Sequence, residues 1–255
     1  MLLKMGIQFI YLRHFKRYET KLKLQGLEIF DSSHLIALLV SFVFIFFLPY
    51  LGKLLTKEQQ KIIVFGIIVF AIVQEIIDYA NRSIVRDLSW DMDLPLHVCH
   101  YVLISAIIGI WRKNQTAFEI GYLLGITGGL QAMLTPDMTD FDNWTAYTTF
   151  YMHHSLIIIC SFWSIFVDRM KPRSIAIQRC FLFLFIMAIP VGIICWITGG
   201  NYMYLREMPN VNNPLVFGQW PWYIINLGFI GLLLMIFAYL PFFAINRWKL
   251  IDDIS

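Results

Sequence analysis

Long apolar runs separated by short polar stretches dominate the pattern of this chain. The runs are continuous and do not alternate, which is typical of transmembrane helices and not of the strands of a membrane barrel. Each run approaches the length that a helix needs to cross about 30 Å of hydrocarbon. The predicted fold class is therefore all-α, an integral membrane bundle of seven transmembrane helices. Their predicted ranges are 34–51, 62–79, 95–111, 120–134, 147–167, 180–198 and 222–245.

The two ends of the chain differ from this bundle, which we place at residues 31–247. The apolar run at residues 2–12 is too short to span a bilayer, and its basic residues follow it instead of preceding it as in a signal peptide. Residues 1–30 are therefore predicted to form an interfacial, basic, partly amphipathic segment. Residues 248–255 are predicted to be a C-terminal tail.

Composition narrows the class of protein further. Hydrophobic residues make up 58% of the chain and charged residues only 15%, whereas about a quarter of a typical soluble domain is charged. A net charge of +3 does not indicate nucleic-acid binding. The four cysteines lie in apolar stretches without disulfide-framework or CxxC spacing. The expected surroundings are membrane lipids, and the oligomeric state is left open.

The distribution of Lys and Arg between loops predicts the orientation, because cytoplasmic loops carry the excess. Three such residues follow spans two, four and six: Arg82, Arg86 and Arg206. Eleven follow spans one, three and five or lie in the C-terminus: Lys53, Lys57, Lys61, Arg112, Lys113, Arg169, Lys171, Arg173, Arg179, Arg247 and Lys249. A multi-pass protein of the cell membrane with a cytoplasmic C-terminus and an outer N-terminus is predicted, although the basic N-terminal segment argues against it.

Polar residues are confined to one half of the predicted bundle. They are His34, Gln74, Glu75, Asp78, Asp93, His97, Cys99, His100, Gln131, His153, His154, Asn201, Gln219 and Asn226. Since polar side chains inside a membrane are costly, their convergence predicts a polar cavity that opens to the outer side. The cytoplasmic half is predicted to be almost purely apolar. A stripe of Gly121, Gly125 and Gly129 predicts close approach between helices.

Covalent catalysis is the chemistry that this cavity favours. Pro95 is expected to open a helix, which places Cys99 about one turn from its positive end, where a thiolate is stabilised. His154 is the natural base for this nucleophile. His97 is a candidate for orienting or polarising the substrate, and Asp93 or Glu75 for holding an imidazole tautomer. Because His153 and His154 point about 100° apart on a helix, only one of them is expected to face the cavity squarely.

Other functions remain open. His97, His100 and His154 could form the three-histidine zinc site of a metal-dependent membrane lipid hydrolase. The sequence has no HExxH or HxxxH pair, however, so no metal and no cofactor are expected. A transporter would be favoured by paired broken helices at the midplane, which the pattern lacks. A seven-helix sensor without catalysis is the remaining alternative.

Several short motifs between His34 and Tyr239 resemble the bacterial YwaF-like family and the similar animal transmembrane protein 164 family. They are LPLHVC at 94–99, QAMLTPD at 131–137, YMHHSLI at 151–157, GNYMYLREMP at 200–209 and WPWY at 220–223. The animal relatives are regarded as acyltransferases that make ether-linked phosphatidylethanolamines. More distant relatives resemble membrane hydrolases of fatty-acid esters that use threonine and histidine.

The resemblance implies site residues for this chain. A His-x-Cys-His element matches His97, Cys99 and His100, a histidine of a later span matches His154 with His153 before it, and an Asn-Tyr-Met element starts at Asn201. The implied function is phospholipid or lysophospholipid acyl transfer through a Cys–His acyl-enzyme at the outer leaflet. Cys99, His154, His97 and Asn201 would be catalytic, the last two as stabilisers of the oxyanion. The expected substrate-binding residues are Glu75, Asp78, His100, His153, Gln131, Tyr202 and Trp222.

Overall fold

The computed structural model describes residues 27–138, 141–209 and 216–252. Within these residues the regular structure is entirely helical, which confirms the predicted all-α class. The main helices are α2 (Ser32–Leu54), α3 (Lys57–Val85), α4 (Val98–Arg112), α5 (Gln115–Leu124), α7 (Trp144–Phe166), α8 (Ala176–Thr198) and α9 (Trp222–Asp252). A π-helical turn, η1 (Gly125–Gly129), joins α5 to the short α6 (Leu130–Leu134). A 3₁₀ turn, η2 (Tyr202–Tyr204), follows α8.

The helices form a multi-pass membrane bundle. Six of the described helices are long and apolar enough to cross a bilayer, counting α5, η1 and α6 as the one helix Gln115–Leu134. The predicted third span, 95–111, corresponds to α4, which is apolar but has only 15 residues. The seven predicted spans therefore correspond to six long helices and one shorter one.

Polar residues in the loops start most of these helices. Asp31 accepts a hydrogen bond from His34 N at the start of α2, and Asn143 accepts one from Ala146 N at the start of α7. Thr56 and Gln59 form a reciprocal capping box at the start of α3. Such caps satisfy the free backbone N–H groups of the first turn. The short polar stretches of the sequence thus set where the apolar helices begin.

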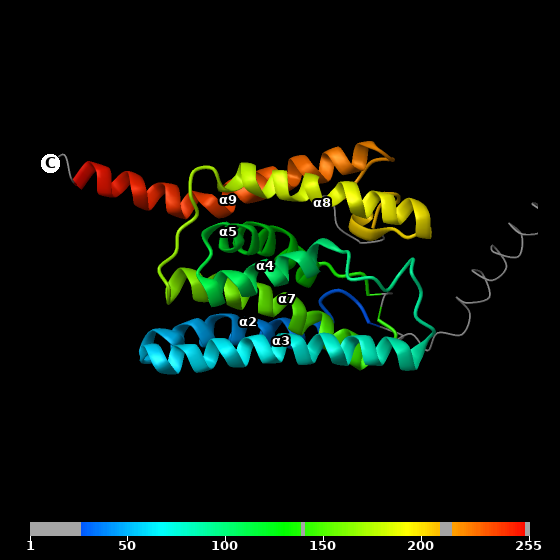
Figure 1. Cartoon of the computed structure of the whole chain (residues 1–255), viewed down its shortest axis with the longest axis horizontal. Coiled ribbons are helices and arrows are strands. Elements are labelled where there is room, and N and C mark those ends of the chain that lie inside the picture. The colour runs from blue at the N-terminus through cyan, green and yellow to red at the C-terminus, as the bar shows by residue number, and fades with distance from the viewer. Residues whose placement is uncertain (1–26, 139–140, 210–215, 253–255) are drawn as a thin grey trace, which may run out of the picture.

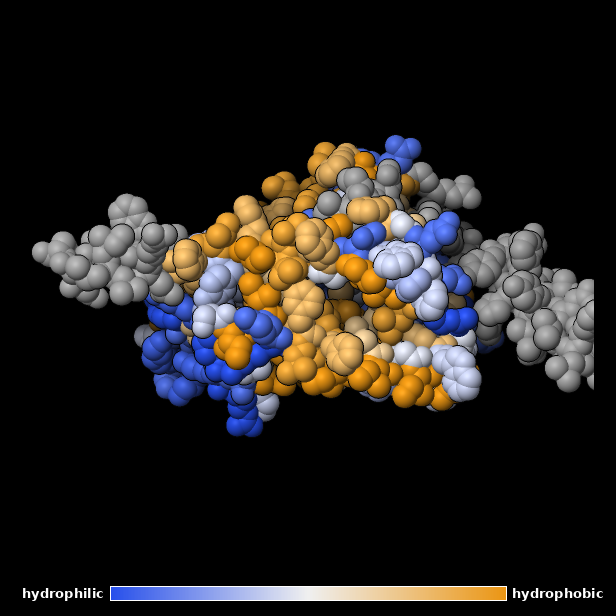
Figure 2. All heavy atoms as spheres, turned by 90° about the horizontal axis from the view of Figure 1, so that it is seen from above, coloured by the Kyte–Doolittle hydropathy of each residue, from blue (hydrophilic) through white to orange (hydrophobic). Residues whose placement is uncertain are grey.

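Helix α7 lies at the centre of the bundle (Figure 1). Its apolar window is 72% buried, compared with 17% for α3, α8 and α9, and it packs against α2, α3, α4 and α5. The outer helices present exposed apolar side chains, such as Phe47, Ile76, Ile186 and Phe237. Figure 2 shows an apolar belt over the middle of the molecule, with hydrophilic side chains gathered toward the two ends. This surface suits contact with lipid.

The glycine stripe brings helices into close contact, as predicted. A Cβ at Gly121 would lie 2.8 Å from Ala106 Cα of α4, and a Cβ at Gly125 would overlap Ile157 Cγ2 of α7. Real Cβ contacts are not this short, so both approaches require glycine. Helices α4, α5 and α7 are therefore packed with little space between their backbones.

One prediction about the opposite half of the bundle was wrong. Glu119 of α5 is fully buried there, although this half was expected to be almost purely apolar. Its carboxylate accepts hydrogen bonds of 2.8 Å from Arg173 Nε and 2.9 Å from Arg173 Nη2, and Arg179 Nη1 lies 3.6 Å away. Pairing with arginine makes this burial tolerable, and it fastens the loop before α8 to α5.

The predicted terminal segments are tested only in part. Nearly all of the proposed interfacial segment, 1–30, lies outside the described residues. At the other end α9 continues to Asp252, past the predicted end of the seventh span at 245 and the predicted tail boundary at 247. The last helix is thus longer than its apolar run.

Candidate functional site

Cys99 and His154 lie next to each other, on α4 and α7. The distance from Cys99 Sγ to His154 Nε2 is 3.3 Å. The other ring nitrogen, Nδ1, is 2.8 Å from the carbonyl oxygen of Phe150, one turn earlier on α7. A carbonyl can only accept, so Nδ1 carries the proton and Nε2 presents its lone pair to the thiol. This is the tautomer that a general base for Cys99 requires.

Helix α4 starts later than the sequence suggested. Its first residue is Val98 and its N-cap is His97, whereas Pro95 was expected to open it. Cys99 is therefore in the first turn of α4 and not one turn further in. The positive end of the helix is closer to the sulfur as a result.

A second polar group, from three helices, lies beside the dyad. His153 Nδ1 of α7 is 2.5 Å from Glu75 Oε1 of α3, and His100 Nε2 of α4 is 3.8 Å from Glu75 Oε2. Gln74 Nε2 donates to the same carboxylate at 2.5 Å. The adjacent His153 and His154 thus face different partners, and only His154 contacts Cys99.

Asp93 organises the loop before α4 and does not orient a histidine. Its carboxylate accepts two hydrogen bonds from Arg86, at 2.6 and 2.5 Å, and one from Ser89 N at 2.7 Å. Burial favours the neutral acid, but the bonds from Arg86 and Ser89 outweigh it, so the pKa of Asp93 lies below its ordinary value. Of the two carboxylates considered for an imidazole, Glu75 holds one and Asp93 does not.

Asp78 links α3 to α7 at the same end of the bundle. Thr149 Oγ1 donates to Asp78 Oδ1 at 2.9 Å, and Arg82 Nη2 lies 2.7 Å from Asp78 Oδ2. Both carboxylate oxygens are therefore engaged within the protein. These contacts support a structural role, and substrate binding by Asp78 stays a prediction.

His97, the N-cap residue of α4, packs against Tyr202. Their ring centroids are 5.4 Å apart, and Tyr204 lies 5.6 Å from His97. The Tyr202 hydroxyl donates to Trp90 O and accepts from Leu94 N, both at 2.9 Å. Tyr202 thereby fastens the segment after α8 to the loop before α4, which helps to place the first turn that carries Cys99.

Asn201 is engaged within its own loop. Its Nδ2 donates to Glu207 O at 2.9 Å, and its Oδ1 accepts from the backbone N–H groups of Arg206 and Glu207 at 3.0 Å. These contacts support a loop-forming role, so oxyanion stabilisation by Asn201 or His97 stays a prediction. Gln131 is half-buried on α6, and Trp222, at the start of α9, is 65% exposed. Substrate binding by these two residues is likewise untested.

One contributor to this end of the bundle was not anticipated, and another, His34, was placed here by the polar pattern. The Phe150 carbonyl that sets the His154 tautomer could have been found from the spacing, because residue i−4 precedes each helical residue by one turn. His34 is fully buried: its Nε2 donates to Met133 O at 2.9 Å, and its Nδ1 accepts from Phe30 N at 2.8 Å. It joins the start of α2 to α6 and is structural.

The described residues contain no group of three or more His, Cys, Asp or Glu side chains placed to hold a metal ion. His97 packs on Tyr202, whereas His154 contacts Cys99. The proposed zinc triad of His97, His100 and His154 therefore finds no support in the geometry.

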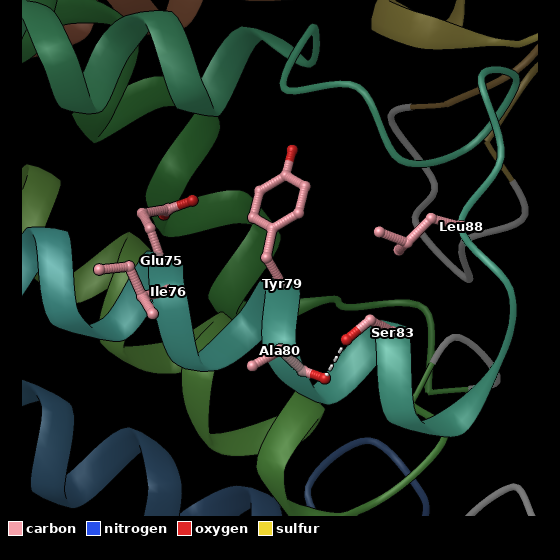
Figure 3. Close-up of a pocket in the computed structure, with 6 residues that line it drawn as sticks. All are labelled: Glu75, Ile76, Tyr79, Ala80, Ser83 and Leu88. Carbon is pink, nitrogen blue, oxygen red and sulfur yellow. Dashed lines mark hydrogen bonds between the residues drawn. The ribbon is translucent and has the colours of Figure 1, made fainter.

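A pocket of about 490 Å³ opens beside the second polar group (Figure 3). Its lining residues are Glu75, Ile76, Tyr79, Ala80, Ser83 and Leu88. Glu75 and Tyr79 project from the same side of α3, and Leu88 comes from the loop that follows it. Glu75 therefore belongs both to the pocket and to the polar group around His153.

Comparison with known proteins yields one result. The family model of the TMEM164 family matches residues 29–239, a range that includes Cys99, His154 and the polar group around Glu75. No curated protein and no solved structure shows a significant match. The family match covers most of the chain and agrees with the resemblance seen in the short motifs. This multi-pass membrane protein therefore belongs to the TMEM164 family.

Proposed function

We propose that the protein is a membrane acyltransferase that moves a fatty-acyl group between lipids through a thioester on Cys99. The observation that carries the proposal is the 3.3 Å contact between Cys99 Sγ and the unprotonated nitrogen of His154. A thiol, a base and a third group that orients the base are the parts that nucleophilic catalysis requires. The implied chemistry of the family points to the same pair.

The first half of the reaction transfers the acyl group to the enzyme. His154 Nε2 takes the thiol proton, and the Cys99 sulfur forms a bond with the acyl carbonyl carbon of a phospholipid. The ester C–O bond then breaks, and the departing lysolipid oxygen takes the proton from His154. The hydrogen bond from Nδ1 to Phe150 O keeps the imidazole oriented throughout.

The second half delivers the acyl group to an acceptor. A hydroxyl oxygen attacks the thioester carbon, the C–S bond breaks, and Cys99 regains its proton. A lysolipid hydroxyl makes the protein a transferase, and water makes it a hydrolase. The site lies at the end of the bundle that carries few Lys and Arg residues, so we propose that the reaction takes place at the outer leaflet.

Intact-mass analysis of the purified chain, incubated with mixed phospholipids, tests this function. Cys99→Ala is expected to carry no acyl adduct and to lose at least about 1,000-fold in transfer rate, because the nucleophile is gone. His154→Asn is expected to lose about 100-fold or more, because the base is gone while an amide can still reach Phe150 O. The matched control is Cys160→Ala, six residues beyond His154 on α7, which should keep its adduct and activity.

The outcome separates the remaining classes of function. A Cys99→Ala variant with full transfer activity would end the covalent proposal. A protein that moves a substrate across the membrane equally well with and without Cys99, and never carries an acyl group, would be a transporter. Stoichiometric zinc together with inhibition by a chelator would instead favour the metal-dependent hydrolase.

A further inference from the structure

The polar group beside the dyad contains buried atoms that lack partners within the described residues. Gln74 is 1% exposed and His153 is 7% exposed. Gln74 Nε2 and His153 Nδ1 each form a hydrogen bond with Glu75 Oε1. Gln74 Oε1, His153 Nε2 and His100 Nδ1 have no hydrogen-bond partner there. Because buried polar atoms are almost always hydrogen-bonded, this is a site prepared for a polar ligand.

The chemistry of these atoms defines the ligand. His153 Nδ1 donates a hydrogen bond to Glu75 Oε1 and so carries the proton of the neutral ring. The other ring nitrogen, Nε2, is therefore an acceptor with a free lone pair. Gln74 Oε1 is also an acceptor, because its amide nitrogen points to Glu75. These two unpartnered acceptors, on residues that both bind Glu75, call for a donor, and the donor suited to an uncharged imidazole is an O–H group.

Glu75 also connects this group to the membrane. It lies in the wall of the 490 Å³ pocket on α3, beside the exposed apolar residues Ile76 and Leu88 (Figure 3). The hydroxyl of Tyr79, in the same wall, donates to Asp93 O, and that of Ser83 donates to Ala80 O. A lipid can therefore approach from the side of the bilayer and meet Glu75 as the charged end of the pocket.

The position relative to the dyad is suitable for a second reacting group. The ring centroids of His153 and His154 are 5.3 Å apart, and those of His153 and His100 are 5.2 Å apart. His100 directly follows Cys99 in the first turn of α4. A hydroxyl bound at His153 would thus lie close to an acyl group on Cys99.

We propose that His153 and Glu75 form the acceptor site, in which His153 binds the incoming hydroxyl and takes its proton. This inference rests on the proposed function. The acceptor oxygen forms a C–O bond with the thioester carbon as the C–S bond breaks, and Glu75 stabilises the imidazolium of His153. The thiolate of Cys99 then regains a proton as His153 releases one, by exchange with water. The O–H group belongs to a lysolipid or to water.

Burst kinetics of the full-length protein in detergent micelles separate the two halves of the reaction. With p-nitrophenyl octanoate as donor, the burst of p-nitrophenolate reports acylation of Cys99, and the later steady rate reports transfer to the acceptor. Glu75→Gln and His153→Asn should keep the burst and slow the steady rate by about 100-fold. His153→Asn keeps an amide that can bond to Glu75, while it removes the basic Nε2. Glu58→Gln, an exposed acid on the same helix, should change neither phase.

Adding lysophosphatidylcholine distinguishes the source of the hydroxyl. If the two variants lose only the part of the steady rate that depends on lysolipid, the site binds a lipid acceptor. If their steady rate falls equally without lysolipid, the site binds water as well. An unchanged steady rate in both variants would overturn the acceptor site, as would burst and steady rate falling together. A wild-type protein with no burst would overturn the proposed function itself, and a burst that persists in either variant shows that it has folded.

Discussion

At the scale of single residues, the site depends on two neighbouring histidines with separate tasks. His154 faces Cys99 at 3.3 Å, while His153 faces Glu75 at 2.5 Å. Consecutive side chains on a helix point about 100° apart. Neighbouring residues of α7 can therefore contact α4 and α3 at the same level. Exchanging or shifting these residues by one position would therefore remove both contacts at once, which is why the HH pair carries more information than either histidine alone.

Asp93 gives a prediction about stability at this scale. It is 5% exposed and holds Arg86 with two hydrogen bonds, so Asp93→Asn should lower the free energy of unfolding by about 1–3 kcal/mol at neutral pH. Burial opposes the charge, but the Arg86 and Ser89 bonds depress the folded-state pKa below its ordinary 3.8. A depressed pKa stabilises the fold above the unfolded value, and this contribution is lost as pH falls through the folded-state pKa.

Thermal unfolding in detergent, measured from pH 7 down to pH 3, checks this prediction. The difference between the wild type and Asp93→Asn should be constant above about pH 5 and should shrink below about pH 4. Glu58→Gln serves as control, because its exposed pair with Lys61 should contribute less than about 1 kcal/mol at any pH. A difference that stays the same down to pH 3 would show that the ionised carboxylate of Asp93 is not what stabilises the loop.

The residue scale also shows how far the sequence pattern reaches. Counting apolar spans places Cys99 and His154 at similar depth, so their meeting could be predicted. The pattern does not give the path of a loop. It therefore could not show that Asp93 turns back to Arg86, or that Asn201 bonds to its own neighbours instead of to a substrate. Depth follows from hydropathy, whereas loop contacts depend on backbone geometry that no periodicity records.

At the scale of elements, the packing of α4, α5 and α7 fixes the distance across the dyad. Gly121 lets α5 approach Ala106 of α4, and Gly125 lets the same helix approach Ile157 of α7, three residues after His154. The helices that carry Cys99 and His154 are therefore both held by α5. Because interiors are close-packed, a displacement of α5 would be felt by the dyad.

Gly121→Ala should consequently disturb both the fold and the site. Its Cβ would fall 2.8 Å from a backbone atom of Ala106, which cannot rotate away, so a loss of about 1–3 kcal/mol in stability is expected. The acyl adduct on Cys99 should form more slowly as well. Gly128→Ala, in the same continuous helix, meets nothing within 4 Å and should leave thermal stability and adduct formation near wild type. Equal behaviour of the two variants would contradict a role for the close approach.

The buried Glu119 shows where reading elements from hydropathy fails. The charge lies one residue before the predicted start of the fourth span, outside the predicted helix. In the structure α5 begins at Gln115, and Arg173 from a distant loop neutralises the carboxylate. A partner 54 residues away cannot be found from the apolar pattern, because that pattern treats a charge as the end of a span.

At the scale of the whole molecule, the polar chemistry and the basic charge lie at opposite ends of the bundle. The loops after α2, α4 and α7 share one end with the terminus of α9, and the loops after α3 and α8 share the other (Figure 1). The first end carries the excess of Lys and Arg, and the second lies nearest to Cys99, Glu75 and His154. The apolar belt separates the two ends, so the two surfaces of the membrane face different chemistry (Figure 2).

This asymmetry predicts that the basic end faces the cytoplasm, because Lys and Arg are retained on that side during insertion. Single cysteines at two exposed positions test it: Lys57→Cys at the start of α3, and Asp87→Cys just after its end. A membrane-impermeant maleimide applied to intact cells should label only Asp87→Cys, and permeabilisation should expose Lys57→Cys. The native cysteines serve as background, since three of the four are buried and Cys99 is half-buried. The reverse labelling would place the Cys99 site at the cytoplasmic leaflet and restrict its lipids to those of the inner surface, while the contact between Cys99 and His154 would stand unchanged.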